Sequence, residues 1–163
     1  MVKFLVRGVG AMALAVAMLF GAAAGAHSAV GIAPDRGPIA GGTTVAVPSP
    51  PGVTFTSISA GKYHSLALGS DHNVYAWGLN SDGQLGDGTR LTRTQAVRVQ
   101  TPEGLRFTSV AAGYSHSLAI GVDGNVYAWG NNEDGRLGDE SLVDKLTPVR
   151  VHAPSGMEFS SVS

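Results

Sequence analysis

Two histidine–serine pairs are the residues of this chain whose types first point to chemistry. His64 precedes Ser65, and His116 precedes Ser117. An imidazole beside a hydroxyl can act as the general base for a nucleophile when a third group orients the ring. The two pairs are 52 residues apart, and no acidic residue recurs at a position suited to orient them. A catalytic site needs its residues in only one copy of a repeat, whereas a residue with a structural role recurs in every copy. We therefore predict packed histidines that hydrogen-bond between sheets, and no enzyme activity.

Two polar loops resemble fragments of calcium-binding loops. They read Asn-Ser-Asp-Gly at 80–83 and Asn-Glu-Asp-Gly at 132–135. Neither continues to the glutamate at the twelfth position that an EF-hand requires, and Asn or Asp before Gly more simply forms an Asx-turn. The chain also has no cysteine, which removes thiolate metal sites, disulfides and cysteine nucleophiles. We therefore predict no metal and no cofactor.

The elements that must position these residues belong to a repeat of 52 residues. Aligning 55–106 with 107–158 gives 28 identities without a gap, and a third copy begins at 159. The match also extends backwards, so the repeats occupy 44–163. A period near 50 residues is typical of propeller blades and solenoids. Trp77 and Trp129 recur with the repeat, which favours core packing over a ligand-stacking role.

Each repeat is predicted to contain four short strands and no helix. The expected strands of the first copy are 55–60, 64–68, 73–77 and 96–99. Asp123-Gly124 favours a type I′ turn, whereas His72 takes the glycine position in the first copy, at positive φ. Along 64–69 bulky residues alternate with small ones, so the bulky face of one sheet is expected to stack on the small face of the next. Sheets that are apolar on both faces suit radial blades.

The segment Ile-Ser-Ala-Gly-Lys-Tyr-His-Ser-Leu-Ala-Leu at 58–68 and its partner at 110–120 resemble the signature of the regulator of chromosome condensation (RCC1) repeats. So does Val-Tyr-Ala-Trp-Gly at 74–78 and 126–130. The resemblance, to the bacterial secreted kind, implies an all-β fold. This would be a partial β-propeller of four-stranded blades, with about two full blades and partial blades at both ends. The resemblance assigns a structural role to Gly61, His64, Trp77, Gly78, Gly86, Gly113, His116, Trp129, Gly130 and Gly138.

The first 26 residues form a predicted signal peptide. Lys3 and Arg7 precede an uncharged apolar stretch, which ends in the small residues Ala-Gly-Ala at 24–26. Cleavage there would begin the mature chain at His27 and place it outside the cell or at the cell surface. Only an uncleaved segment would attach the chain to a membrane.

Residues 27–43 carry a second resemblance. Pro-Asp-Arg-Gly-Pro at 34–38 and Gly-Gly-Thr-Thr-Val at 41–45 look like the start of an immunoglobulin-like IPT/TIG domain. We interpret this segment as a junction that leads into the repeats.

Charge and the differences between the copies indicate a protein-binding role. Without Lys3 and Arg7 the 11 basic residues become 9, against 12 acidic ones, and this net charge of −3 argues against nucleic acid. The copies differ at every position of 88–96 and 140–148. Such differences are expected either of loops that drift without constraint or of binding loops on a fixed scaffold. Because Tyr and Arg are over-represented in hot spots, the predicted contacts with an unidentified protein partner are Arg90, Arg93, Tyr114 and Arg136.

The sequence therefore predicts a non-catalytic protein-interaction module, secreted or at the cell surface. Two alternatives stay open. The family's secreted β-lactamase inhibitors imply inhibition of an extracellular enzyme, and an accessory binding domain of a larger cell-wall or carbohydrate-active enzyme would show the same repeats. Two blades leave apolar faces uncovered, and repeat arrays need about three units or more for stability. Several copies of the chain, or a longer parent chain, would complete the propeller.

Overall fold

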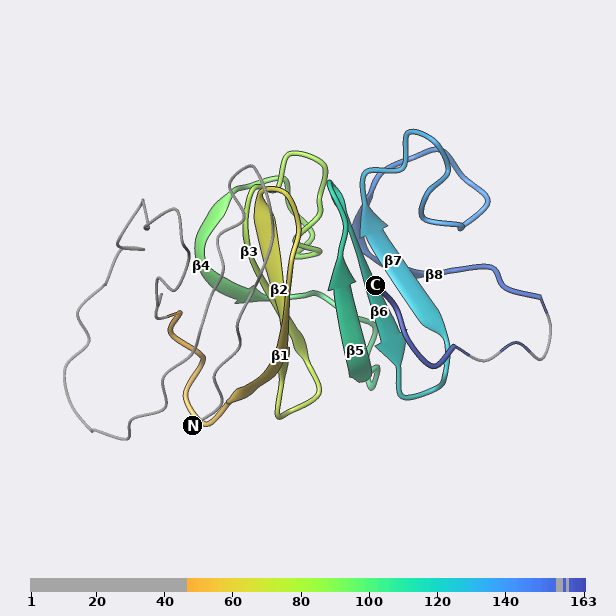
Figure 1. The fold of residues 1–163 in the computed structure, drawn as a ribbon. Coiled ribbons are helices and arrows are strands. Elements are labelled where there is room, and N and C mark those ends of the chain that lie inside the picture. The colour runs from red at the N-terminus through yellow and green to blue at the C-terminus, as the bar shows by residue number, and fades with distance from the viewer. Residues whose placement is uncertain (1–46, 155–156, 158) are drawn as a thin grey trace, which may run out of the picture.

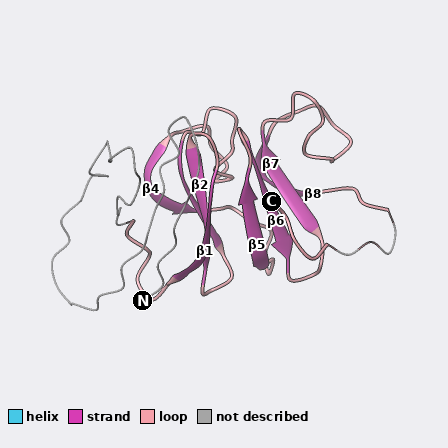
Figure 2. Cartoon of the chain, viewed as in Figure 1, coloured by secondary structure: helices cyan, strands magenta, loops and turns pink. Residues whose placement is uncertain are grey.

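The computed structural model describes residues 47–154, 157 and 159–163, which form two four-stranded antiparallel sheets (Figure 1, Figure 2). The first sheet contains β1 (Phe55–Ala60), β2 (His64–Gly69), β3 (Val74–Gly78) and β4 (Arg93–Arg98). The second contains β5 (Phe107–Ala112), β6 (His116–Gly121), β7 (Val126–Gly130) and β8 (Lys145–Arg150). Each sheet pairs its strands in sequence order. The predicted signal peptide and the segment 27–43 lie outside the described residues.

In this described part of the chain, we find no helix with the length and apolar character needed to cross a membrane.

Tight turns join the second and third strands of each sheet. Between β2 and β3 the Asp71 carboxylate accepts hydrogen bonds from the Asn73 amide (3.2 Å) and the Tyr75 hydroxyl (2.8 Å). The same bonds recur 52 residues later. His72 has a φ of 60°, and its counterpart Gly124 has a φ of 75°. The predicted positive φ of this histidine is therefore confirmed.

The fourth strand of each repeat begins earlier than the sequence predicts. We expected a strand at 96–99, but β4 already begins at Arg93, which pairs with Gly78. A register shift between Ala76 and Gly78 lets the strand bend there and continue pairing. Four of the nine residues of the segment 88–96, which we expected to be a solvent-facing loop, therefore belong to the sheet.

β2 and β3 place bulky side chains beside small ones across the strand pair. Leu66 pairs with Ala76, and Trp77 pairs with Ser65. The prediction of one bulky and one small face per sheet is therefore wrong. β2 carries its large residues on one face and β3 carries them on the other, so each face is mixed. The small partner gives each large side chain room to lie flat on its own sheet.

The main core lies between the two sheets. Its buried members are Leu66, Leu68, Val74, Ala76, Leu85 and Val99 from the first repeat and Phe107, Val110, Ala119 and Trp129 from the second. One face of the first sheet thus packs on the opposite face of the second, which is the stacking that consecutive blades require. A smaller cluster of Phe55, Ala67, Tyr75 and Trp77 covers the other face of the first sheet.

Trp129 lies at the centre of this junction between the sheets. Its side chain is fully buried, and its indole N–H donates to the Gln84 carbonyl at 2.9 Å. The ring lies against Gly86, where a Cβ atom would come within 2.7 Å of the indole nitrogen. Glycine is therefore required at this position for two reasons. It leaves space for an aromatic ring of the next sheet, and it adopts a positive φ of 68°.

His64 bridges the same two sheets. Its Nε2 lies 3.0 Å from the Ser117 hydroxyl, and that hydroxyl donates to the Gln84 carbonyl at 2.8 Å. Because the single hydroxyl proton goes to Gln84, Nε2 carries the ring proton and donates to Ser117. The ring occupies the space beside Gly61, where a Cβ atom would lie 2.5 Å from Cε1. Burial, followed by the charge of His116, lowers the pKa of His64 from 6.5 to about 4.

Replacing Gly86 by alanine should cost more stability than replacing its counterpart Gly138. Both glycines have positive φ, 68° and 61°, so each alanine carries a similar backbone penalty of about 1–2 kcal/mol. At Gly86 the methyl also meets the Trp129 indole, whereas at Gly138 it meets only a Val151 methyl, at 3.0 Å. The indole clash adds about 1–3 kcal/mol. Urea unfolding measures both losses, and equal losses would show that the Trp129 contact does not control the junction.

Acid should weaken the fold between pH 6.5 and about 4. In this range the unfolded chain protonates His64 and the folded chain does not, so stability is full above pH 6.5 and falls as the pH approaches 4. The loss is at most about 3 kcal/mol, from 1.36 kcal/mol per pKa unit. Burial also lowers the pKa of His116, which adds to the loss in the same direction.

Urea unfolding at pH 7.5 and 4.5 measures this loss. His64→Gln should flatten the pH dependence, whereas the control Ser117→Ala should lower stability and keep the dependence. A pH dependence that is identical in the wild type and in His64→Gln would contradict the account.

Candidate interaction surface

Antiparallel pairing places two connections of each repeat at the same end of the sheets. The β1–β2 turn (61–63) and the β3–β4 loop (79–92) share one end of the first sheet. The turn 113–115 and the loop 131–144 do the same in the second. We call these four segments the loop end, and they lie at the top of Figure 1.

An aromatic cluster at the loop end joins the two repeats. The Lys62 ammonium lies 4.8 Å from the ring centroid of Tyr63 and 4.0 Å from that of Tyr114, whose hydroxyl accepts a hydrogen bond from it. Tyr63 and Tyr114 are 52% and 60% exposed. A cation–π contact with Tyr63 and the hydrogen bond to the Tyr114 hydroxyl hold the lysine beside the rings, so the cluster presents a positive charge next to flat apolar surface. We call these three residues the tyrosine–lysine cluster.

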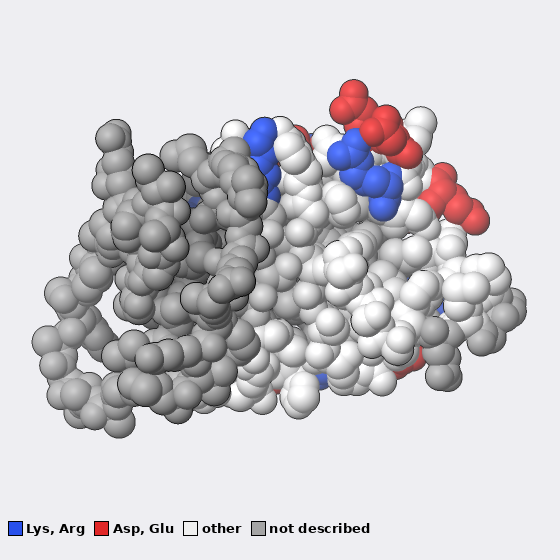
Figure 3. All heavy atoms as spheres, viewed as in Figure 1, with Lys and Arg blue, Asp and Glu red and all other residues white. Residues whose placement is uncertain are grey.

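Other apolar side chains are exposed at the same end. Leu91, Leu142 and Val143 join the two tyrosines there, whereas the exposed Val122 and Met157 lie elsewhere. Basic and acidic side chains also gather at the top of the molecule in the view of Figure 3. Exposed apolar groups concentrated among charged ones are typical of a protein-binding surface.

The four predicted contact residues have different surroundings. Tyr114 belongs to the tyrosine–lysine cluster. Arg90 is half-exposed and pairs with Asp144 at 3.1 Å, so it links the loops of the two repeats. Arg136 pairs with Asp134 of its own loop. Three of the four therefore lie on the loop end, with Arg90 and Arg136 already engaged by carboxylates.

Arg93 lies in a different setting from the other three. Its side chain is half-buried and pairs with the buried carboxylate of Asp87 at 2.7 Å, and its backbone belongs to β4. The counterpart Lys145 pairs with Asp139 at 3.0 Å. This placement gives Arg93 a structural partner, and we leave it out of the surface.

Buried asparagines hold the two long loops in shape. The Asn80 side-chain oxygen accepts from the Leu85 amide at 2.9 Å, and its nitrogen donates to Asp87 (3.1 Å) and to the Thr89 carbonyl (2.9 Å). Asn132 repeats this arrangement. The side-chain oxygens of Asn80 and Asn132, the first residues of the two calcium-like segments, are thus engaged within their loops. Across the described residues, no group of three or more His, Asp or Glu side chains is placed to hold a metal ion.

A comparison of the two repeats by residue identity misses one interaction that both repeats share. Thr89 and Ser141 differ in type, yet each donates its amide and hydroxyl to the aspartate two residues before it. Burial alone would raise the pKa of Asp139, but hydrogen bonds from Lys145 and Ser141 lower it to about 2. A comparison of side-chain type would have found this interaction, because each aspartate is followed by a hydroxyl residue and then by a basic residue.

The histidine–serine neighbours do not form a catalytic pair in the structure. His64 contacts the hydroxyl of Ser117, 53 residues away, and Ser65 points to the opposite face of β2 because successive side chains alternate. His116 is half-buried, and burial followed by the charge of Arg136 lowers its pKa. The His64 imidazole therefore lies in the packing between the sheets. The His116 imidazole lies on the face of the second sheet that also carries Leu118, which points away from the first sheet.

Comparisons with known proteins agree with this architecture. One regulator of chromosome condensation (RCC1) repeat profile matches residues 71–120 and 123–163, and a second matches 55–84 and 107–136. The Arabidopsis thaliana "RCC1 domain-containing protein RUG3, mitochondrial" is 36% identical over 127 residues, 76% of this chain and 28% of the relative. The Arabidopsis "Ultraviolet-B receptor UVR8" is 37% identical over 112 residues, 69% of this chain and 26% of the relative.

The structure of Prp20p from Saccharomyces cerevisiae superposes with a TM-score of 0.57 and 26% identity, covering 70% of this chain and 29% of that protein. The chain thus spans between a quarter and a third of the length of these three relatives. Because the first profile covers more than half of the chain, and the stacked sheets superpose on a solved member, the chain belongs to the RCC1 repeat family and forms part of its β-propeller.

Proposed function

We propose that this chain is a non-catalytic protein-interaction module that binds its partner through the loop end. The observation that carries the proposal is the tyrosine–lysine cluster, in which two exposed rings and a positive charge come from two different repeats. Tyrosine is enriched in binding hot spots because it gives a large, rigid contact area. The stacked sheets fix the distance between the rings, so little freedom is lost on binding.

The relatives support binding as the role of such repeats. Prp20p is described with its binding properties to Gsp1p and histones, and UVR8 is named as a receptor. The partner of the present chain would offer a carboxylate to Lys62 and a flat apolar group to the rings. The predicted signal peptide and the acidic charge of the remaining chain support an extracellular protein as this partner, rather than nucleic acid.

Capture of extracellular proteins on the immobilised chain tests this function. The wild type should retain a partner that Tyr63→Ala/Tyr114→Ala loses by at least tenfold, because the truncation of two hot-spot side chains costs about 2 kcal/mol or more. The control Val122→Ala changes an exposed residue outside the loop end and should bind like the wild type.

Two results would count against the proposal. Retention of the same partners by the double tyrosine variant, the control and the wild type would exclude the loop end as the binding surface. A wild-type chain that retains no extracellular protein would contradict the proposal of an extracellular partner.

A further inference from the structure

An ion pair between the two long loops links the repeats at the loop end. The Arg90 guanidinium lies 3.1 Å from the Asp144 carboxylate and also donates to the Ser81 carbonyl of its own loop at 2.6 Å. The other carboxylate oxygen of Asp144 accepts from the Asn132 amide at 2.9 Å. Each side chain is therefore also anchored in its own loop. We call Arg90 and Asp144 the inter-loop pair.

The inter-loop pair does not belong to the repeated architecture. The counterpart of Arg90 is Leu142 and the counterpart of Asp144 is Thr92, so neither charge recurs in the other copy. The buried aspartates of the loops, by contrast, each pair with a basic residue of their own repeat. An exposed ion pair also contributes little to global stability. A pair that is absent from the repeat pattern and weak in stability is suited to shaping the surface at which it lies.

Two exposed apolar side chains flank the inter-loop pair. Leu91 follows Arg90 and Val143 precedes Asp144, and the two apolar residues occupy the same position in the two repeats. Their exposed fractions are 62% and 66%. The amides of both residues donate to a hydroxyl of their own loop, at 3.2 and 3.4 Å. These side chains are therefore exposed on backbone that hydrogen bonds hold in place.

The loop of the first repeat rests on the second repeat. The Gly88 amide donates to the Leu146 carbonyl at 3.0 Å, and a Cβ atom at Gly83 would lie 2.5 Å from a methyl group of Leu146. Leu91 remains exposed in spite of these contacts. Its exposure therefore belongs to the loop tip rather than to an open end of the stack, and Val143 holds the same position one repeat later.

We propose that the inter-loop pair fixes the spacing of Leu91 and Val143, so that both side chains meet an apolar segment of the partner as one preformed surface. This inference rests on the proposed function of the loop end and adds a second contact region to the tyrosine–lysine cluster. A preformed surface loses less conformational freedom on binding. Arg90, a predicted contact residue, is then a positioning residue.

The charges of the inter-loop pair define the chemistry of this contact region. The guanidinium and the carboxylate compensate each other, so the surface between the two apolar tips carries no net charge. A charged side chain of the partner would have to break the pair in order to bind there. The region therefore favours an uncharged, apolar segment, whereas Lys62 favours a carboxylate.

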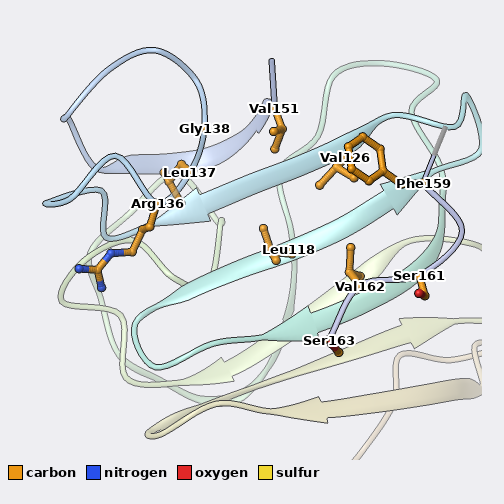
Figure 4. Close-up of a pocket in the computed structure, with 10 residues that line it drawn as sticks. All are labelled: Leu118, Val126, Arg136, Leu137, Gly138, Val151, Phe159, Ser161, Val162 and Ser163. Atoms are coloured by element: carbon orange, nitrogen blue, oxygen red, sulfur yellow. The ribbon is translucent and has the colours of Figure 1, made fainter. Parts of the chain in front are cut away.

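Arg136 supplies a matched control. It also pairs with a carboxylate, but with that of Asp134 in its own loop. Its guanidinium points away from the hollow that Leu118 and Val126 line on the second sheet (Figure 4). Asp134→Asn therefore removes a carboxylate charge from the same loop as Asp144→Asn does, without removing a link between the repeats.

The spacing of the loops can be measured without a partner. The full 163-residue chain contains no cysteine, so spin labels attach only at Thr92→Cys and Leu142→Cys, one exposed position in each loop. Electron paramagnetic resonance should show a narrow distance distribution, which Asp144→Asn broadens and Asp134→Asn leaves unchanged. Asp144→Asn keeps an oxygen that can accept from the Asn132 amide. Urea unfolding should give nearly the same midpoint for both variants, because exposed ion pairs add little to global stability.

Binding of the extracellular protein that the immobilised wild type retains separates positioning from contact. Asp144→Asn should weaken this binding by about threefold to tenfold, because the loop tips must then be ordered on binding. Arg90→Gln should weaken it by a similar factor, and the double variant no further, since both changes remove the same pair. Leu91→Ala/Val143→Ala should weaken binding and leave the loop spacing unchanged.

Three results would overturn the proposal. They are an unchanged distance distribution in Asp144→Asn, losses of Arg90→Gln and Asp144→Asn that add in the double variant, and wild-type binding by Leu91→Ala/Val143→Ala. A wild type that retains no extracellular protein defeats the proposed function and this contact region with it. The distance distribution then still decides whether the inter-loop pair fixes the spacing of the loops.

Discussion

The contact of the Trp129 indole with Gly86 and the Gln84 carbonyl ties the two sheets into one structure. Each sheet carries apolar side chains on both of its faces, because large residues of β2 lie on one face and large residues of β3 lie on the other. A single sheet would expose these side chains to water. Stacking resolves this by setting the face with Trp129 on the face with Leu66. The same carbonyl also accepts the Ser117 hydroxyl, which in turn receives the His64 N–H. This series of hydrogen bonds therefore fixes the register in which the apolar faces of the two sheets meet.

The loop end depends on that register. Lys62 and Tyr114 come from different repeats, and they meet only because the sheets are held at one spacing. Within each repeat, Asn80 or Asn132 anchors the long loop from a fully buried position. The loops are thus held firmly at their bases, whereas their tips, including Leu91 and Leu142, are exposed. This division lets one scaffold present different side chains without a change of fold.

Much of the fold follows from sequence, because the 52-residue repeat predicts four strands in each copy and sheets that stack on one another. Three features do not. The start of β4 at Arg93 depends on a register shift opposite Gly78, which no local pattern reveals. The mixed faces depend on how β2 pairs with β3, which alternation along one strand cannot give. The tyrosine–lysine cluster depends on two turns from different sheets, and Tyr114 is the one predicted contact residue that belongs to it. Arg93 differs in identity from its counterpart Lys145, but the two residues share their positive charge and their pairing with an aspartate.

The central claim is that the two sheets form one cooperative unit through the Trp129 contact. Native-state hydrogen exchange of the wild type and Trp129→Phe, which keeps the ring and removes the indole N–H donor, tests it most directly. The account predicts that the amides of β2 and β6 open with the same free energy, and that both values fall together in the variant. If β6 loses protection while β2 keeps its own, the sheets are independent units and the account is contradicted.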